Sequence, residues 1–346
     1  MGQLKNKKDS GDFRKKSVPP WVKSVVFYLI FIILLGTAIY FHCDFFLDVM
    51  RSIGEIPIWL FVFVCLSGCL YRIIDGDLLY RLGRRYQPDL KWGQGIACAF
   101  SGAFFQVTTL GSGMGISKIY YLTRLGIPAA NSTGICLIQY ILDRTAIFLY
   151  GFAAYLMFPT LRTAIRPYRF FGILGIVICL FMIGVLILVA TSSQLSARLL
   201  SVVRRICKNH PKWLSKIDYM EEQICLLQAE TALVFRDKKL TVQLIFECLL
   251  MQTFWYVIPY LAMQGKGPNL LTSIAFISAA RMLAGSVPLP SGYGSLDIIF
   301  IVLLSGMVET AIATSTMVLF RFATTFVPFF IGAVIVFLWR KRSVAS

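Results

Sequence analysis

The sequence predicts an all-α integral membrane protein, and three observations support that fold class. Of its 346 residues, 57% are hydrophobic. Only 15% are charged, against about 25% in an ordinary soluble domain. The apolar residues also stand in long runs, several of about 20 residues, which is enough for a helix to cross the roughly 30 Å hydrocarbon core of a bilayer.

Six of the apolar runs have the length of full transmembrane spans. They are Val22–Tyr40, Ile58–Ile74, Ser132–Phe158, Phe170–Ala190, Leu240–Met263 and Ala311–Trp339. Three further runs are too short or too broken for comfortable spans, namely Gly93–Leu110, Leu271–Val287 and Leu296–Met307. These shorter runs need a different interpretation.

The shorter runs fit two helical hairpins, each interrupted by a break rich in Gly or Pro. In residues 93–126 the break contains Gly111, Gly113 and Gly115, and in residues 271–307 it contains Pro288, Pro290, Gly292 and Gly294. We expect each pair to enter and leave through one membrane face, the first opening inward and the second outward. About six full spans with two such re-entrant hairpins are typical of inverted-repeat transport folds. The alternative is eight plain transmembrane helices with glycine kinks.

Basic residues predict the orientation and the division of the chain. Seven Lys or Arg residues lie between the N-terminus and Lys23, most of them in the N-terminal tail (residues 1–21). The C-terminal tail, residues 340–346, begins Arg340-Lys341-Arg342. Because basic residues concentrate on the cytoplasmic side, we expect both termini to be cytoplasmic. Between the tails we expect a first membrane half at 22–191, a cytoplasmic amphipathic loop at 192–239 and a second membrane half at 240–339. Arg162, Arg166 and Arg169 do not fit this scheme, because they would lie outside.

Charge and composition also exclude several classes of partner. The formal net charge is +17, but the basic residues stand at the ends of apolar runs, where they meet anionic lipid headgroups. We therefore expect no direct binding of nucleic acid, since no polar domain could hold it. The cysteines are scattered without metal-ligand spacing and the only histidines are His42 and His210. We expect no metal site, no cofactor and no histidine-based catalytic triad.

The two breaks are the first candidate sites. Non-helical backbone at membrane depth leaves N–H and C=O groups without partners, at several kcal/mol each, so it persists only when buried in protein or lining a wet cavity. Helices that restart near Ser117 and Ser295 would direct their positive N-terminal ends into the membrane interior. An anionic headgroup is a natural ligand for such ends. Alternatively, the glycines only permit close packing.

Ionisable residues within the apolar segments are the second kind of candidate. Each costs at least about 2.5 kcal/mol at the membrane centre, so each should pair or face water. Arg281 and Arg321 could bind a phosphate bidentately, with Arg144 and Lys118 as further headgroup candidates. Their expected charge partners are Asp297, Asp143 and Glu247. The alternative is mutual neutralisation, for instance of Asp297 by Arg281 or Arg321.

Two motifs carry a resemblance to a known family. The first runs from Phe104-Phe105 through Ile119-Tyr120-Tyr121 to Gly126-Ile127-Pro128 and Ser132, and the second is Pro288-x-Pro290-Ser291-Gly292-x-Gly294-x-x-Asp297. With them the chain resembles the transmembrane, flippase-like region of the lysylphosphatidylglycerol synthase family over roughly residues 20–340, and Arg321 matches a late arginine of that family. The first motif departs from the family at Thr108-Thr109 and Gly113-Met114, and the second departs at Ser291 and Asp297, where the family has glycine and glutamate.

The resemblance implies a function in lipid modification at a bacterial plasma membrane. In full-length members the membrane part moves aminoacylated phosphatidylglycerol between leaflets, and a soluble domain transfers lysine from lysyl-tRNA to the lipid. The product lowers negative surface charge and gives resistance to cationic antimicrobial peptides. Because this chain ends seven residues after its last apolar run, we expect that soluble domain to be missing.

The expected function is therefore that of a flippase-like protein that binds or translocates anionic or aminoacylated phospholipid. One alternative is a phosphatidylglycerol lysyltransferase. Another is a membrane subunit that recruits a separate synthase through the loop at 192–239. The sequence leaves the oligomeric state open.

Overall fold

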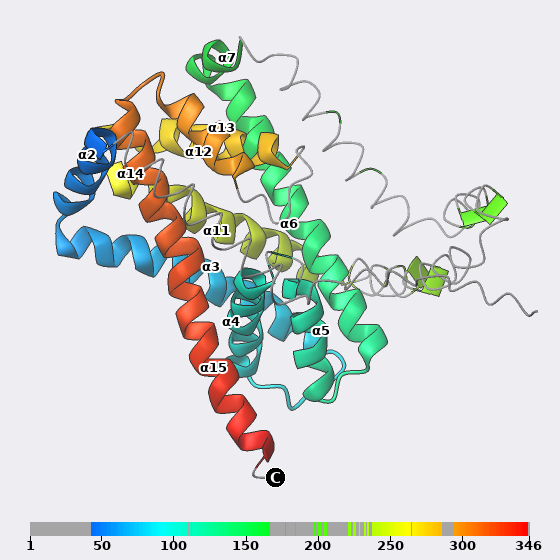
Figure 1. The fold of residues 1–346 in the computed structure, drawn as a ribbon. Coiled ribbons are helices and arrows are strands. Elements are labelled where there is room, and N and C mark those ends of the chain that lie inside the picture. Colours follow the sequence, from blue (N-terminus) through cyan, green and yellow to red (C-terminus); the bar gives the residue numbers. More distant parts are fainter. Residues whose placement is uncertain are drawn as a thin grey trace, which may run out of the picture. The chain divides into compact units, whose positions relative to one another are not determined.

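The computed structural model describes residues 43–109, 111, 113–166, 237–263, 265–285 and 294–344, with scattered residues between 177 and 234. The regular elements of this part of the chain are all helices (Figure 1). The chain divides into two compact units, Met1–Met50 and Arg51–Ser346. Helix α2 (Cys43–Gly54) crosses that boundary, and every other helix belongs to the second unit.

Four described helical segments are long and apolar enough to cross a membrane, which confirms the predicted fold class. Three are α3 (Ile58–Gly83), α6 (Ala129–Met157) and α11 (Lys238–Met263). The fourth, Thr310–Leu338, belongs to a C-terminal helix built from α14 (Thr310–Arg321), η3 (Phe322–Phe326) and α15 (Val327–Val344). The predicted span at Val22–Tyr40 and nearly all of the one at Phe170–Ala190 lie outside the described residues.

Two pairs of short helices fold as hairpins. In the first, α4 (Trp92–Thr108) is followed by α5 (Gly113–Arg124). The Cys98 thiol lies 3.7 Å from the carbonyl oxygen of Lys118, although 20 residues separate them; a straight helix would place them about 30 Å apart. In the second, α12 (Leu270–Ala284) packs against α13 (Ser295–Leu304). Helices of 10 and 12 residues are too short to cross a bilayer, which favours hairpins over plain spans.

Two boundaries differ from the sequence-based expectation. The apolar run Ile58–Ile74 predicts a span that ends at Ile74, but α3 continues to Gly83. It continues because Leu78, Leu79 and Leu82 remain fully buried against neighbouring helices. Helix α5 begins at Gly113 rather than near Ser117, so the first break is shorter than expected.

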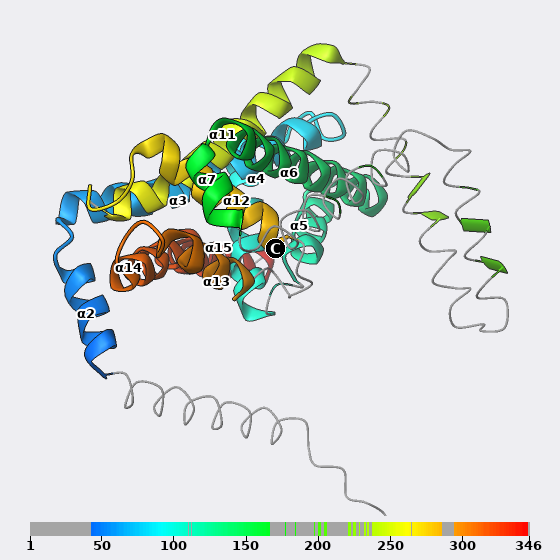
Figure 2. The same cartoon turned by 90° about the horizontal axis from the view of Figure 1, so that it is seen from above.

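The described chain repeats one order of elements: a long helix, two short helices and another long helix (Figures 1 and 2). The first series is α3, α4, α5 and α6; the second is α11, α12, α13 and the C-terminal helix. The packing repeats as well, because α4 packs against α15 whereas α12 packs against α6, and α3 packs against α11. The first helix of each hairpin thus packs against the last long helix of the other series. Paired repeats of this kind are typical of transporter folds.

Close helix contacts in this arrangement depend on glycine. A Cβ atom at Gly332 of α15 would stand 2.1 Å from the carbonyl oxygen of Phe100 in α4. A Cβ atom at Gly76 of α3 would stand 2.5 Å from the Cα of Ile96 in α4. Small residues allow membrane helices to approach closely where the hydrophobic effect does not drive association.

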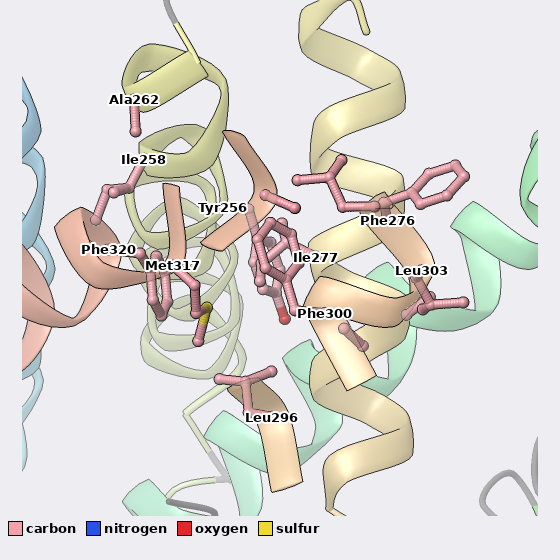
Figure 3. Packing of buried hydrophobic residues seen from close by; sticks show 14 of the residues in the cluster. Tyr256, Ile258, Ala262, Phe276, Ile277, Leu296, Phe300, Leu303, Met317 and Phe320 are labelled. Atoms are coloured by element: carbon pink, nitrogen blue, oxygen red, sulfur yellow. The ribbon is translucent and has the colours of Figure 1, made fainter. Parts of the chain in front are cut away.

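The buried side chains form two apolar cores. One core joins α6, α11, α12, α13 and α14; Figure 3 shows Tyr256 close to Ile277 and Phe300, with Met317 and Phe320 beside them. The other joins α3, α4, α5, α6 and α11 around Leu78, Leu122, Ile135 and Leu244. The two cores hold the hairpins against the long helices, and buried polar groups lie among them.

Candidate functional site

Lys118 of α5 lies at the centre of a buried polar group, which we call the Lys118 cluster: Arg72, Asp75, Gln106, Lys118 and Gln139. The Lys118 ammonium donates to both carboxylate oxygens of Asp75, at 2.9 and 3.1 Å, and to Gln139 Oε1 at 3.2 Å. Gln139 in turn donates to the Asp75 backbone carbonyl and carboxylate. Because these side chains come from α3, α5 and α6, the cluster ties the first hairpin to two long helices.

Arg72 is the second cation of this cluster and is only 7% exposed. Its Nη1 lies 3.6 Å from Asp75 Oδ2, and its Nη2 donates to Gln106 Oε1 of α4 at 2.8 Å. Asp75 is therefore shared by two cations, Arg72 and Lys118. Burying an ion pair is costly, and an excess charge is costlier still.

A second group surrounds Arg281, and we call it the Arg281 cluster: Asp143, Arg144, Gln252 and Arg281. Arg281 Nη1 of α12 donates to Gln252 Oε1 of α11 at 2.6 Å, and Gln252 Nε2 donates to Asp143 Oδ1 of α6 at 2.7 Å. Asp143 also lies 3.8 Å from nitrogens of both Arg281 and Arg144. Here too, two cations share one carboxylate.

Aromatic rings surround the Arg281 guanidinium. Its Cζ lies 4.0 Å from the ring centroid of Trp255 and 5.9 Å from those of Tyr71 and Tyr256. The Arg72 guanidinium lies over the same Tyr71 ring, at 5.3 Å. Ring faces attract cations by about 0.5–2 kcal/mol, so Tyr71 stabilises a cation of each cluster. An aromatic ring cannot cancel a whole charge.

Arg321 and Asp297 form a separate bidentate pair. Arg321 Nε lies 2.6 Å from Asp297 Oδ1, and Nη2 donates to Oδ2 at 3.0 Å. Asp297 Oδ2 also accepts from the Gly294 amide at 2.8 Å, so this carboxylate caps the start of α13. Of the alternatives left open for Asp297, the structure has the pair with Arg321, which joins the second hairpin to α14.

Glu247, expected as a charge partner, lies in a fourth polar group. Its Oε1 is 2.7 Å from Arg81 Nε, which is also 2.8 Å from Asp77 Oδ2. Trp92 Nε1 donates to Asp77 Oδ1 at 3.0 Å. This group joins the end of α3 and the first half of α11 to the start of α4, and it carries more acidic than basic side chains.

The Thr109 side chain bridges the first break by hydrogen bonds to both of its ends. Its hydroxyl donates to the Phe105 carbonyl at 2.6 Å and accepts from the Gly113 amide at 2.7 Å. It thereby links the last turn of α4 to the first residue of α5. A Cβ atom at Gly113 would lie 2.5 Å from that hydroxyl oxygen, and Gly111 has a φ of 101°, so both positions require glycine.

The second break lies largely outside the described residues. Pro288, Pro290 and Gly292 lie outside them. Gly294 is described and has a φ of 86° immediately before α13.

The structure divides the predicted site residues between several places. Arg281, Arg144 and Asp143 come together, Lys118 lies in its own cluster, and Arg321 is held by Asp297. Sequence reasoning missed the polar residues that complete the two clusters: Arg72, Asp75, Gln106, Gln139 and Gln252. Arg72 lies near the end of the apolar run Ile58–Ile74 and Asp75 directly follows that run, so no local signal showed that the helix continues past them to Gly83. Among the described residues, no group of His, Cys, Asp and Glu could hold a metal ion.

The family model described as the lysylphosphatidylglycerol synthase TM region matches residues 21–332 of the chain. The match includes both hairpins, both polar clusters and most of the C-terminal helix. Comparison with the curated proteins gives no match. Because the family model covers most of the chain, this protein belongs to the family of the lysylphosphatidylglycerol synthase transmembrane region.

Proposed function

We propose that the protein is a flippase-like membrane protein that binds or translocates an anionic or aminoacylated phospholipid, of the phosphatidylglycerol type, in a bacterial plasma membrane. The family match indicates a lipid-related membrane function. The observation that carries the finer proposal is the excess of positive charge in the Arg281 cluster, where the largely buried Arg281 and the partly exposed Arg144 share Asp143.

The physical reason is electrostatic compensation. A buried cation without a full counter-charge is destabilising by several kcal/mol, and a phosphodiester supplies one negative charge with oxygens that suit the planar fork of arginine. Arg281 is the stronger candidate for this contact. Arg321 is the weaker candidate because its guanidinium already makes two hydrogen bonds to the Asp297 carboxylate.

Transport can be measured with the purified protein in liposomes that contain a fluorescent phosphatidylglycerol, with dithionite quenching the outer leaflet. We expect Arg281→Gln to lower the protein-dependent rate at least about tenfold, because it removes a charge-assisted contact worth about 1.5–3 kcal/mol. Lys266→Gln is the matched control, because it removes an exposed cation that pairs with Glu55 in a loop.

Two outcomes would contradict this proposal. Transport by Arg281→Gln at the wild-type rate would exclude the arginine contact. Formation of lysyl lipid by the purified protein from lysyl-tRNA and phosphatidylglycerol, without a partner chain, would favour the lysyltransferase instead.

A further inference from the structure

Arg72 is a buried cation whose charge is incompletely neutralised. Its only near carboxylate, among the described residues, is that of Asp75, with 3.6 Å between Nη1 and Oδ2. Both oxygens of that carboxylate lie closer to the Lys118 ammonium. Arg72 Nε is fully buried and has no hydrogen-bond acceptor in the described part of the chain. One positive charge and one N–H group thus remain uncompensated.

The Arg72 guanidinium lies against the N-terminal end of α5. Its Nη1 is 3.8 Å from the sulfur of Met114, the second residue of that helix. The first amides of a helix lack intrahelical acceptors and carry the positive end of the helix dipole. Thr109 accepts from the Gly113 amide, and the amides of Met114 and Gly115 follow in the same turn. The start of α5, whose Met114 side chain contacts Arg72, therefore also carries positive potential.

The first turn of α5 is open on one side. A Cβ atom built on Gly115 would meet no other atom within 4 Å. Gln106, whose Oε1 accepts from Arg72 Nη2 at 2.8 Å, holds the guanidinium in place at the end of α4. This open space lies in the first turn of α5, the turn whose Met114 side chain contacts Arg72.

We propose that Arg72, Gln106 and the first turn of α5 form a binding site for a phosphate-type anion, either the phosphodiester of a phospholipid headgroup or free phosphate. A phosphodiester carries one negative charge, which matches the excess in the Lys118 cluster. Its oxygens suit the Arg72 guanidinium and the helix amides, the combination that binds phosphate at helix N-termini. The site uses other residues than the Arg281 cluster, although Tyr71 lies against an arginine of each. It rests on the proposed function only where the anion is a lipid.

The melting temperature of the purified full chain in neutral detergent reports binding, because a ligand that binds only the folded state raises it. The probes are inorganic phosphate and short-chain phosphatidylglycerol, with short-chain phosphatidylcholine as the zwitterionic control. A rise with phosphatidylglycerol alone assigns the site to a lipid headgroup, and a rise with phosphate alone or with both assigns it to phosphate in general. No rise with either anion overturns the proposal.

Arg72→Gln separates binding from a structural role. We expect the apparent Kd of the stabilising anion to rise at least about tenfold, while the melting temperature without anion stays equal or rises, because Asp75 keeps Lys118 as its partner. A lower melting temperature with an unchanged anion response would show that Arg72 only supports the fold, and would overturn the proposal.

Gly115→Asp tests the same site without removing a side chain. We expect a carboxylate in this open space to occupy the helix end, raise the melting temperature without anion and abolish the anion response. Gly115→Ala, the matched control, should respond as the wild type does. An unchanged response in Gly115→Asp would overturn the site. A normal anion response without lipid transport would instead leave the site standing and remove the proposed function.

Discussion

At the residue scale, two arginines of the second series show how environment decides the role of one residue type. Arg321 faces a carboxylate of its own, and that carboxylate also caps α13 through the Gly294 amide. Arg281 shares its carboxylate with Arg144 and contacts an amide and three aromatic rings. Arg321 therefore fits a structural contact, and Arg281 fits a contact with an exogenous anion.

The Asp297–Arg321 pair makes a testable prediction about stability. Asp297→Asn keeps a cap for the Gly294 amide but leaves Arg321, largely buried, without its counter-charge. We expect the free energy of unfolding to fall by about 1–3 kcal/mol, measured as a lower melting temperature in detergent.

The double variant Asp297→Asn with Arg321→Gln is the control for that prediction. It removes the uncompensated charge as well, so part of the lost stability should return. If the double variant is no more stable than Asp297→Asn, the ion pair does not explain the loss.

The exposed pair of Glu55 and Lys266 shows the opposite case. Lys266 donates a hydrogen bond to the Glu55 carboxylate, and this contact lowers the pKa of Glu55. Exposed pairs of this kind are worth little, because water screens them. Lys266 is for that reason a suitable control position in the transport assay.

At the element scale, glycine decides how closely the helices pack. The Phe100 carbonyl of α4 occupies the space that a Cβ atom at Gly332 of α15 would need. Backbone atoms in a packed helix cannot move aside as a flexible side chain can. The close contact between the first hairpin and the C-terminal helix therefore requires a residue without a Cβ atom at position 332.

Replacing two glycines by alanine should change stability in opposite directions. We expect Gly332→Ala to lower the free energy of unfolding by about 1–3 kcal/mol, because it overpacks the α4–α15 contact. Gly93→Ala is the matched control: nothing lies within 4 Å of its added Cβ, so helix propensity should stabilise it by up to about 1 kcal/mol. Thermal unfolding measures both, and equal effects would contradict the proposed contact.

At the scale of the whole molecule, the two series of helices place related polar pairs between equivalent elements. Arg72 of α3 binds Gln106 of α4, and Gln252 of α11 binds Arg281 of α12. In both cases an arginine–glutamine contact joins the opening long helix to the first hairpin helix, with the two residue types exchanged. Each series thus contributes one incompletely neutralised arginine, which suits a protein that handles an anion at two positions.

The predicted orientation of the hairpins can be tested with single cysteines in a background without the native cysteines. Lys91→Cys, before α4, should react with a membrane-impermeant maleimide from the cytoplasmic side if the first hairpin opens inward as predicted. Lys266→Cys, before α12, should react from the outside. Labelling of both positions from the same side would contradict the opposite orientation of the hairpins.

The sequence by itself determined the membrane class, the four described spanning helices and the two interruptions near Gly111 and Gly294. These features depend on the length of apolar runs and on Gly and Pro, which act locally. It also identified Arg281, Arg321, Lys118 and Asp297 as unusual, because charge within an apolar run is visible without a fold.

Only the tertiary structure decided which charges meet. The contacts that define the two clusters join residues 29, 34, 43 and 109 positions apart, and no local pattern encodes such pairs. Arg72, two residues before the end of its apolar run, was missed for the same reason: its burial depends on the packing of α3 against α4 and α11. The site is set by long-range packing, whereas the helices are set by local composition.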